Sequence, residues 1–209
     1  VLAPEHAMTA ISHLDYCDRF EPILTRFADT LEGADFTTPV PSCGDDWDLR
    51  DLAEHLGSLH RWVERMVRER APERIVRADM GIVVPENAEL AAWLRAGIAP
   101  LLTALRGCPP DAPMWAWGVD QHARFWSRRQ VHEGLVHLLD AEWALGREPL
   151  ALDAEIAADG IDEFLENTPC AVYWAPRLAE IRGEGETLAF HATDCDAAWT
   201  MRSEEHTSE

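Results

Sequence analysis

The sequence contains no lysine, and its 18 basic residues, all arginine, are outnumbered by 38 acidic ones. The formal net charge of −20 repels nucleic acid and anionic membranes at long range. The arginines are also too dispersed to form a strong basic patch. We therefore expect neither nucleic acid nor a membrane as a partner. Arginine without lysine, together with abundant alanine, is typical of a GC-rich genome.

Long apolar runs and paired cysteines are missing as well. No run approaches the roughly 18 apolar residues that span a bilayer, and residues 1–10 lack the basic flank and apolar core of a signal peptide. The five cysteines form no CxxC pair, which argues against a disulfide framework and against a cysteine-based zinc site. These absences predict a cytoplasmic protein with reduced thiols.

Hydrophobic residues make up 47% of the chain, which is enough for a packed core. They recur at steps of three and four residues in long segments, a pattern that predicts amphipathic helices. The predicted helices cover residues 10–31, 48–70, 86–106 and 122–146. Four such helices joined by loops predict a mainly α chain whose first domain, residues 10–147, is an antiparallel four-helix bundle.

The pattern changes after Pro149. A further helix is predicted over residues 153–166, where Ile156, Ile161 and Phe164 are expected to pack against the bundle. Two short strands, 187–193 and 197–201, are expected to pair with each other at most. So small a part buries little surface by itself. Residues 150–201 are thus predicted to be a partial α+β domain, and residues 202–209, which match the translation of a sequencing adapter, a non-native tail.

Candidate chemistry lies in the fourth predicted helix. The helix carries the pattern HExxxH, which differs by one residue from the HExxH of zinc proteases. His132 and His137 are five residues apart, about 140° around a helix, so they do not share a face. Glu133 and His137 are four apart and do share one. The usable ligand pair is therefore Glu133 with His137, and His132 is expected to point away.

Helical geometry places this pair on the bundle's interior side, together with Trp126, while Glu142 falls on the side predicted to face solvent. A carboxylate buried without a partner costs several kcal/mol, so Glu133 needs a metal or a basic neighbour. His55 lies beside the apolar stripe of the second helix, and metal sites in bundles draw ligands from facing helices. Two histidines and one carboxylate suit zinc or another divalent ion and leave a coordination position open.

A purely structural alternative stays open at this point. Glu133 can pair with Arg129 one turn earlier, and His137 can pair with Asp140 three residues later. Either pairing satisfies the buried group without a metal. Asp140 also has the spacing to hold the second ring nitrogen of His137 if that residue ligates a metal.

Two stretches resemble the signatures of the mycothiol-dependent maleylpyruvate isomerase family, which belongs to the DinB-like superfamily. Residues 41–57 read PSCGDDWDLRDLAEHLG, and residues 125–142 read FWSRRQVHEGLVHLLDAE. Residues 157–164 and 188–194 are similar to the start of the family's C-terminal domain, which is expected to continue beyond Met201.

The resemblance implies a DinB-like bundle that holds one divalent metal, usually zinc, through His55, Glu133 and His137. It also implies an actinobacterial source and the thiol mycothiol as cofactor. Zinc lowers the pKa of a bound thiol. The thiolate can add to an activated double bond, and rotation followed by loss of the thiol gives the trans isomer.

The same thiolate can instead be transferred to an electrophile. The expected partners are thus a small thiol and a small substrate that is electrophilic or bears a carboxylate. Arg129 is expected to bind such a carboxylate bidentately, and Trp126 to line the pocket. Two other functions are carried forward: a metal hydrolase whose open position holds hydroxide, and a metal-binding bundle with a regulatory or interaction role and no catalysis.

Overall fold

A computed structural model describes the chain except for residues 1, 5–10, 174, 181–182 and 203–209. The chain divides into two compact units, each described by itself. The bundle unit comprises Ile11–Ala116 and Asp120–Ala151, and the second unit comprises Val1–Ala10, Trp117–Val119 and Leu152–Glu209. The helices of the bundle unit are α1 (His13–Thr30), α2 (Leu49–Glu69), the short 3-10 helix η1 (Arg77–Met80), α3 (Asn87–Gly107) and α4 (Ala123–Ala144). The elements of the second unit are β1 (Leu2–Pro4), α5 (Ala154–Asn167), the 3-10 helices η2 (Thr168–Tyr173) and η3 (Pro176–Glu180), β2 (Thr187–His191) and β3 (Ala198–Arg202).

The first two helices begin with reciprocal caps. The Ser12 side chain accepts from the backbone N–H of Asp15, whose carboxylate accepts from the backbone N–H of Ser12. Asp48 and Asp51 repeat this arrangement at the start of α2. Because each cap satisfies two backbone donors that have no partner inside the helix, it fixes where the helix begins.

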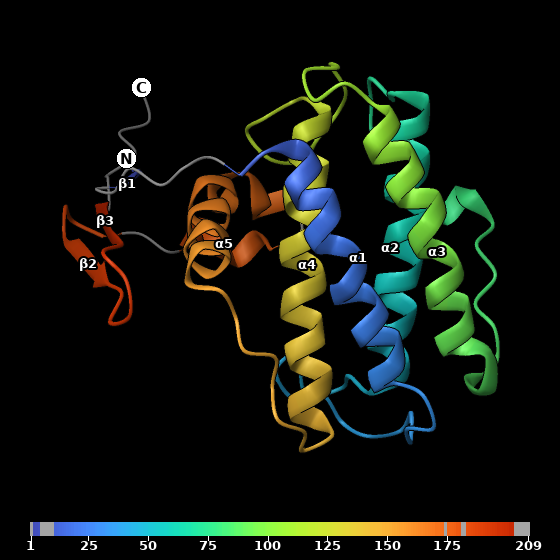
Figure 1. The fold of residues 1–209 in the computed structure, drawn as a ribbon. Coiled ribbons are helices and arrows are strands. Elements are labelled where there is room, and N and C mark those ends of the chain that lie inside the picture. Colours follow the sequence, from blue (N-terminus) through green and yellow to red (C-terminus); the bar gives the residue numbers. More distant parts are fainter. Residues whose placement is uncertain (1, 5–10, 174, 181–182, 203–209) are drawn as a thin grey trace. The chain divides into compact units, whose positions relative to one another are not determined.

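Helices α1 to α4 form a four-helix bundle (Figure 1), as predicted from the sequence. Helix α1 packs against α3 and α4, and α2 packs against the same two helices. Consecutive helices run antiparallel except α2 and α3, which run in the same direction because residues 71–86 return along the bundle. At one end Arg50 of α2 donates to the carbonyl of Pro85, just before α3. At the other end Trp115 N–H, in the loop after α3, donates to Ala71 O, just after α2.

Two glycines allow the helices to approach closely. A Cβ on Gly57 of α2 would lie 2.0 Å from the ring of Trp93 in α3, and one on Gly134 of α4 would lie 2.6 Å from Leu24 in α1. Arg61, one turn after Gly57, lies 3.9 Å from the centre of the Trp93 ring and donates to Gly57 O. These contacts hold α2, which carries His55, firmly against α3.

Helix α3 has the length and apolar composition of a membrane span. Its leucines from Leu90 to Leu105 and Ile98 are buried, and the helix packs against α1 and α2. These contacts are typical of a core helix of a bundle.

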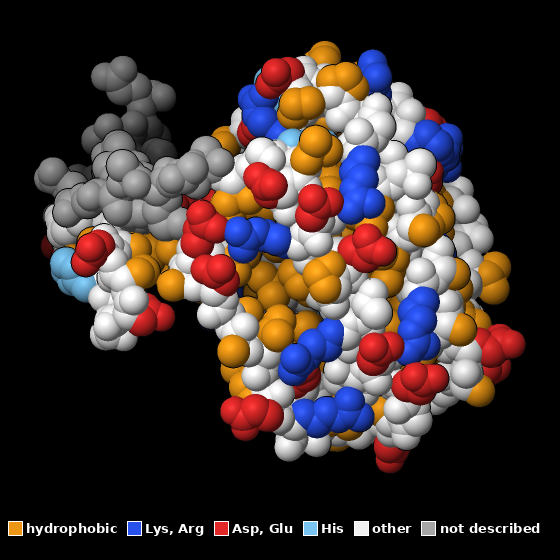
Figure 2. Space-filling view, viewed as in Figure 1, with side chains coloured by type: hydrophobic (Ala, Val, Ile, Leu, Met, Phe, Trp, Pro, Cys, Tyr) orange, Lys and Arg blue, Asp and Glu red, His pale blue; other side chains and the backbone are white. Residues whose placement is uncertain are grey.

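The bundle surface mixes both signs of charge, as Figure 2 shows for one face.

Glu142 of α4, which we expected in solvent, is 2% exposed, so that prediction is wrong. Arg26 of α1 donates to Glu142 Oε1 at 2.6 Å, and the backbone N–H of Leu150 donates to Oε2 at 2.7 Å. The sequence pattern of α4 gave no sign of these partners, because they come from α1 and from the chain beyond the helix.

The second unit combines α5 with a three-stranded antiparallel sheet in the order β1-β3-β2. Its buried core contains Ala158, Leu165, Ala197 and Trp199, and the Trp199 indole N–H donates to Asp162 at 2.7 Å. The prediction that the two C-terminal strands pair with each other at most is wrong, because β3 also pairs with β1. A three-residue strand at the N-terminus carries too little periodicity to be recognised from sequence.

Two of the three α5 side chains that we expected to pack against the bundle are exposed. Ile156 is buried, but Ile161 is 41% exposed and Phe164 is 64% exposed. The predicted tail, 202–209, lies outside the described residues except for the backbone of Arg202, which ends β3.

Candidate metal centre

Three side chains from two facing helices meet inside the bundle unit. His55 lies two turns after the capping box that begins α2, and Glu133 and His137 lie one turn apart on α4. The Nε2 atom of His55 is 3.0 Å from Glu133 Oε1, and the Nε2 atom of His137 is 3.3 Å from the same oxygen. The two imidazole rings are 5.1 Å apart, centre to centre, and nearly perpendicular.

This donor set fits a divalent ion. One ligand atom from each residue lies within 4.8 Å of the other two. Two ligands of a tetrahedral zinc, each about 2.1 Å from the metal, lie about 3.4 Å apart. The observed separations of 3.0 and 3.3 Å therefore need only small side-chain adjustments. Two imidazole nitrogens and one carboxylate oxygen leave a fourth position for an exogenous ligand.

His137 is oriented from its other side by Asp140. Its Nδ1 atom lies 3.0 Å from Asp140 Oδ2, an oxygen that also accepts from the Cys43 thiol at 3.3 Å. Burial alone lowers the pKa of His137, but the hydrogen bonds to Asp140 and Glu133 outweigh it and raise the pKa to about 9. Burial, then the negative charge of Asp140, raises the pKa of Cys43 to about 12, so this thiol stays protonated.

Glu133 is ionised although only 14% of its side chain is exposed. Burial alone raises the pKa of its carboxyl group, but the positive charge of Arg129 and the hydrogen bonds from His137 and His55 hold it well below the usual value. Arg129 Nη2 donates to Glu133 Oε2. The pairings of the purely structural alternative, Arg129 with Glu133 and His137 with Asp140, are thus both present. They are compatible with the convergence of His55, Glu133 and His137.

A pocket of about 620 Å³ adjoins the centre at His55. Trp47, in the loop before α2, lines it and contacts the His55 ring edge-on at 5.6 Å between ring centres. The remaining lining residues come from the loop before α2, from the first half of α2, and from η1 and the residues that follow it. They are Asp46, Asp51, Glu54, Ser58, Arg77, Ala78, Gly81, Ile82 and Val84. Sequence reasoning did not assign Trp47, although it lies inside the stretch 41–57.

Trp126 is not brought to the three donors. It is buried two turns before Glu133 in an aromatic cluster with Trp62, Trp115 and Phe125, and its indole N–H donates to Trp115 O. Its contacts give no support to a catalytic role. His132 is also apart from the donors and lies edge-on to Tyr16 of α1.

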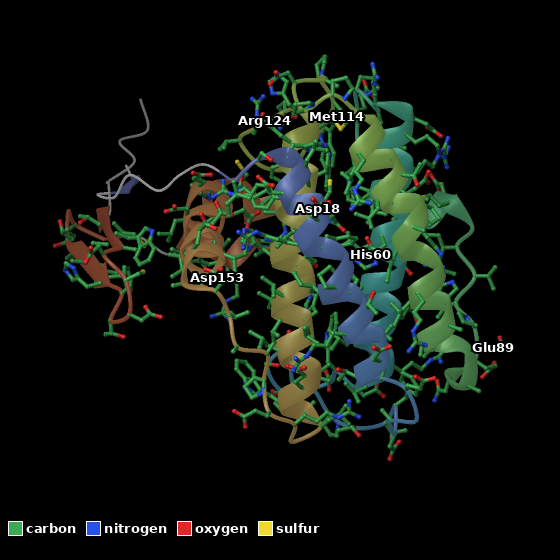
Figure 3. The ribbon with its side chains drawn as sticks, in the orientation of Figure 1. Asp18, His60, Glu89, Met114, Arg124 and Asp153 are labelled. Carbon is green, nitrogen blue, oxygen red and sulfur yellow. The ribbon has the colours of Figure 1, made fainter. Side chains whose placement is uncertain are left out.

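Two buried polar side chains near the centre were not assigned from sequence. His60 lies in the bundle interior between α1 and α2 (Figure 3), edge-on to Phe20. Burial lowers its pKa to about 3, so it is neutral. Among the described residues, neither ring nitrogen of His60 nor either amide atom of Gln130 has a hydrogen-bond partner.

Comparison with known proteins identifies the family of the chain. The family described as mycothiol maleylpyruvate isomerase N-terminal domain matches residues 19–142, a segment that contains His55, Glu133 and His137. Searches among curated proteins and among solved structures returned no match. The family match covers more than half of the chain and runs from α1 to α4. The chain therefore belongs to the mycothiol maleylpyruvate isomerase N-terminal domain family.

Proposed function

We propose that the bundle unit binds a divalent metal, zinc in the first place, through His55, Glu133 and His137 and uses it to activate the thiol of mycothiol. The observation that carries the proposal is the convergence of these three donors beside an open pocket. A bound zinc would supply Lewis acidity, which lowers the pKa of a thiol that binds at the fourth position. Trp47 and the pocket walls would hold the rest of the thiol beside the centre.

The charges of the pocket favour one of the two thiol reactions. Three carboxylates line it, those of Asp46, Asp51 and Glu54, against the single guanidinium of Arg77. A substrate with two carboxylates, such as maleylpyruvate, would be repelled by this lining. We therefore favour S-transfer to an uncharged electrophile over isomerisation of a dicarboxylate.

The two reactions differ in their thiol balance. In S-transfer the sulfur forms a new bond to carbon, the electrophile loses its leaving group or gains the thiol proton, and one thiol is consumed per product. In isomerisation the sulfur–carbon bond forms and then breaks, so the thiol is returned. Thiol consumption, measured beside product formation, separates the two.

Cobalt substitution tests the proposal. Addition of mycothiol to the cobalt-loaded protein is expected to produce thiolate-to-cobalt absorption in the near ultraviolet. His55→Ala should abolish cobalt binding. The control His122→Ala, which removes a histidine bound to Asp120 at the start of α4, should not. Cobalt binding without a response to mycothiol would exclude thiol activation and leave the hydrolase or the non-catalytic metal-binding protein. Absence of metal binding would refute the metal centre itself.

A further inference from the structure

The two oxygens of Glu133 face different partners. Oε1 lies toward the two imidazoles, 3.0 Å from His55 Nε2 and 3.3 Å from His137 Nε2. Oε2 accepts from Arg129 Nη2. One oxygen is thus directed to the candidate metal position, and the other is held on the opposite side by a guanidinium.

Arg129 lies behind the ligands and not in the pocket. It is absent from the residues that line the pocket at His55. Its side chain is 19% exposed and that of Glu133 is 14% exposed, so water screens the pair only weakly. Both residues are on α4, one turn apart, and the close contact of Gly134 with α1 fixes this part of the helix. The pair is therefore a fixed feature of the helix and is poorly placed to release Arg129 to a substrate.

We propose that Arg129 is a positioning residue that restricts Glu133 to a single ligand oxygen and thereby keeps one coordination position free for the thiol. The inference rests on the proposed metal centre. A carboxylate with both oxygens free can bind a metal through both, so that its second oxygen takes the fourth position of the ion. The guanidinium prevents this because it occupies Oε2. This positioning role takes the place of the one suggested by the sequence, in which Arg129 binds a substrate carboxylate.

Arg129 also sets the charge of the centre. Glu133 and Asp140 contribute one negative charge each, and Arg129 contributes one positive charge. His137 must be neutral to ligate, so with a divalent ion the net charge is +1, which a single thiolate neutralises. Without Arg129 the same centre is neutral before the thiol binds and negative afterwards, which disfavours the thiolate.

The test compares Arg129→Gln with Arg129→Lys in the cobalt-loaded protein. Four-coordinate cobalt absorbs visible light more strongly than five-coordinate cobalt, so the spectrum reports how many ligand atoms are bound. In Arg129→Gln the absorption per cobalt is expected to fall by about half or more, and the affinity for mycothiol by about tenfold or more. Arg129→Lys keeps a charged donor near Oε2 and is expected to retain most of the wild-type spectrum.

A matched control separates positioning from simple stabilisation. Arg124→Gln removes another arginine of α4, in the first turn of the helix (Figure 3), which pairs with Asp120. It should leave the spectrum unchanged. A wild-type spectrum in Arg129→Gln overturns the inference, even if that variant melts at a lower temperature. The proposed function is tested separately, by the response of the wild-type protein to mycothiol.

A second measurement decides the matter if Arg129→Gln does not fold. X-ray absorption of the zinc-loaded wild-type protein counts the nitrogen and oxygen atoms around the metal. Four atoms at about 2.0–2.2 Å are expected. Five or more would contradict the four-coordinate centre with a single Glu133 oxygen and would overturn the inference.

Discussion

Raising the pH should destabilise the metal-free protein through His137. The imidazole lies between Asp140 and Glu133, at 3.0 and 3.3 Å. Burial alone lowers its pKa, but these two carboxylates outweigh it and raise the pKa from 6.5 to about 9. In the unfolded chain the same imidazole titrates at its ordinary value, near 6.5.

The sign follows from the protons bound in each state. Between pH 6.5 and about 9 the folded protein keeps the His137 proton and the unfolded chain has lost it, so the free energy of unfolding falls as the pH rises. The stabilisation that comes from the raised pKa of His137 is fully present below pH 6.5 and is lost above about pH 9. At about 1.4 kcal/mol per pH unit, the whole fall is about 3 kcal/mol.

Urea unfolding in the presence of a chelator, at intervals from about pH 6 to pH 9.5, measures this fall. The Cys43 thiol, whose pKa is raised from about 9 to about 12, begins to lower the free energy of unfolding only from about pH 9, so it affects only the upper end of this window. The variant His137→Gln should be less stable at pH 6 and should lack most of the fall. Zinc should also flatten the curve of the wild-type protein, because metal-bound His137 carries no extra proton. An equal fall in His137→Gln would refute the reasoning, since another group would then be titrating.

Three further changes test other parts of the bundle unit. Gly57→Ala should lower the free energy of unfolding by about 1–3 kcal/mol, because the new methyl group meets the ring of Trp93. The control Gly107→Ala, whose Cβ has nothing within 4 Å, should not destabilise the protein. Equal urea midpoints for the two variants would contradict this. Gln130→Met replaces an amide that is buried without a hydrogen-bond partner among the described residues. It should therefore raise the urea midpoint and stabilise the protein by about 1 kcal/mol. A loss of stability would show that the amide is hydrogen-bonded in solution. Trp126→Phe should change the tryptophan fluorescence and leave cobalt binding intact, because Trp126 packs in the aromatic cluster apart from the donors. Loss of cobalt binding would show that Trp126 contributes to the metal site.

Much of the bundle follows from local sequence. The spacing of apolar residues predicts the four helices, and capping residues such as Asp48 mark where they begin. The pairing of Glu133 with His137 is equally local, since residues four apart on a helix share a face wherever the helix lies. His55 could be proposed because its position beside the apolar stripe of α2 turns it inward.

Other features depend on elements far apart in sequence. The parallel course of α2 and α3 depends on the path of residues 71–86, which no periodicity records. The burial of Glu142 depends on Arg26, and the third strand depends on pairing with the N-terminus. The local sequence around Glu142 or around β3 does not indicate either of these distant partners.

For Arg129, the sequence determined one part of its role and the tertiary structure decided the other. Sequence alone determined that it lies one turn from Glu133, a spacing that allows an ion pair but equally allows a side chain turned toward a substrate. Only the tertiary structure decided between the two, by bringing His55 and His137 to one oxygen of Glu133 and leaving the other to Arg129. The reason is physical: helix periodicity fixes the direction of a side chain around its own axis, whereas the partner in that direction depends on which helix packs there.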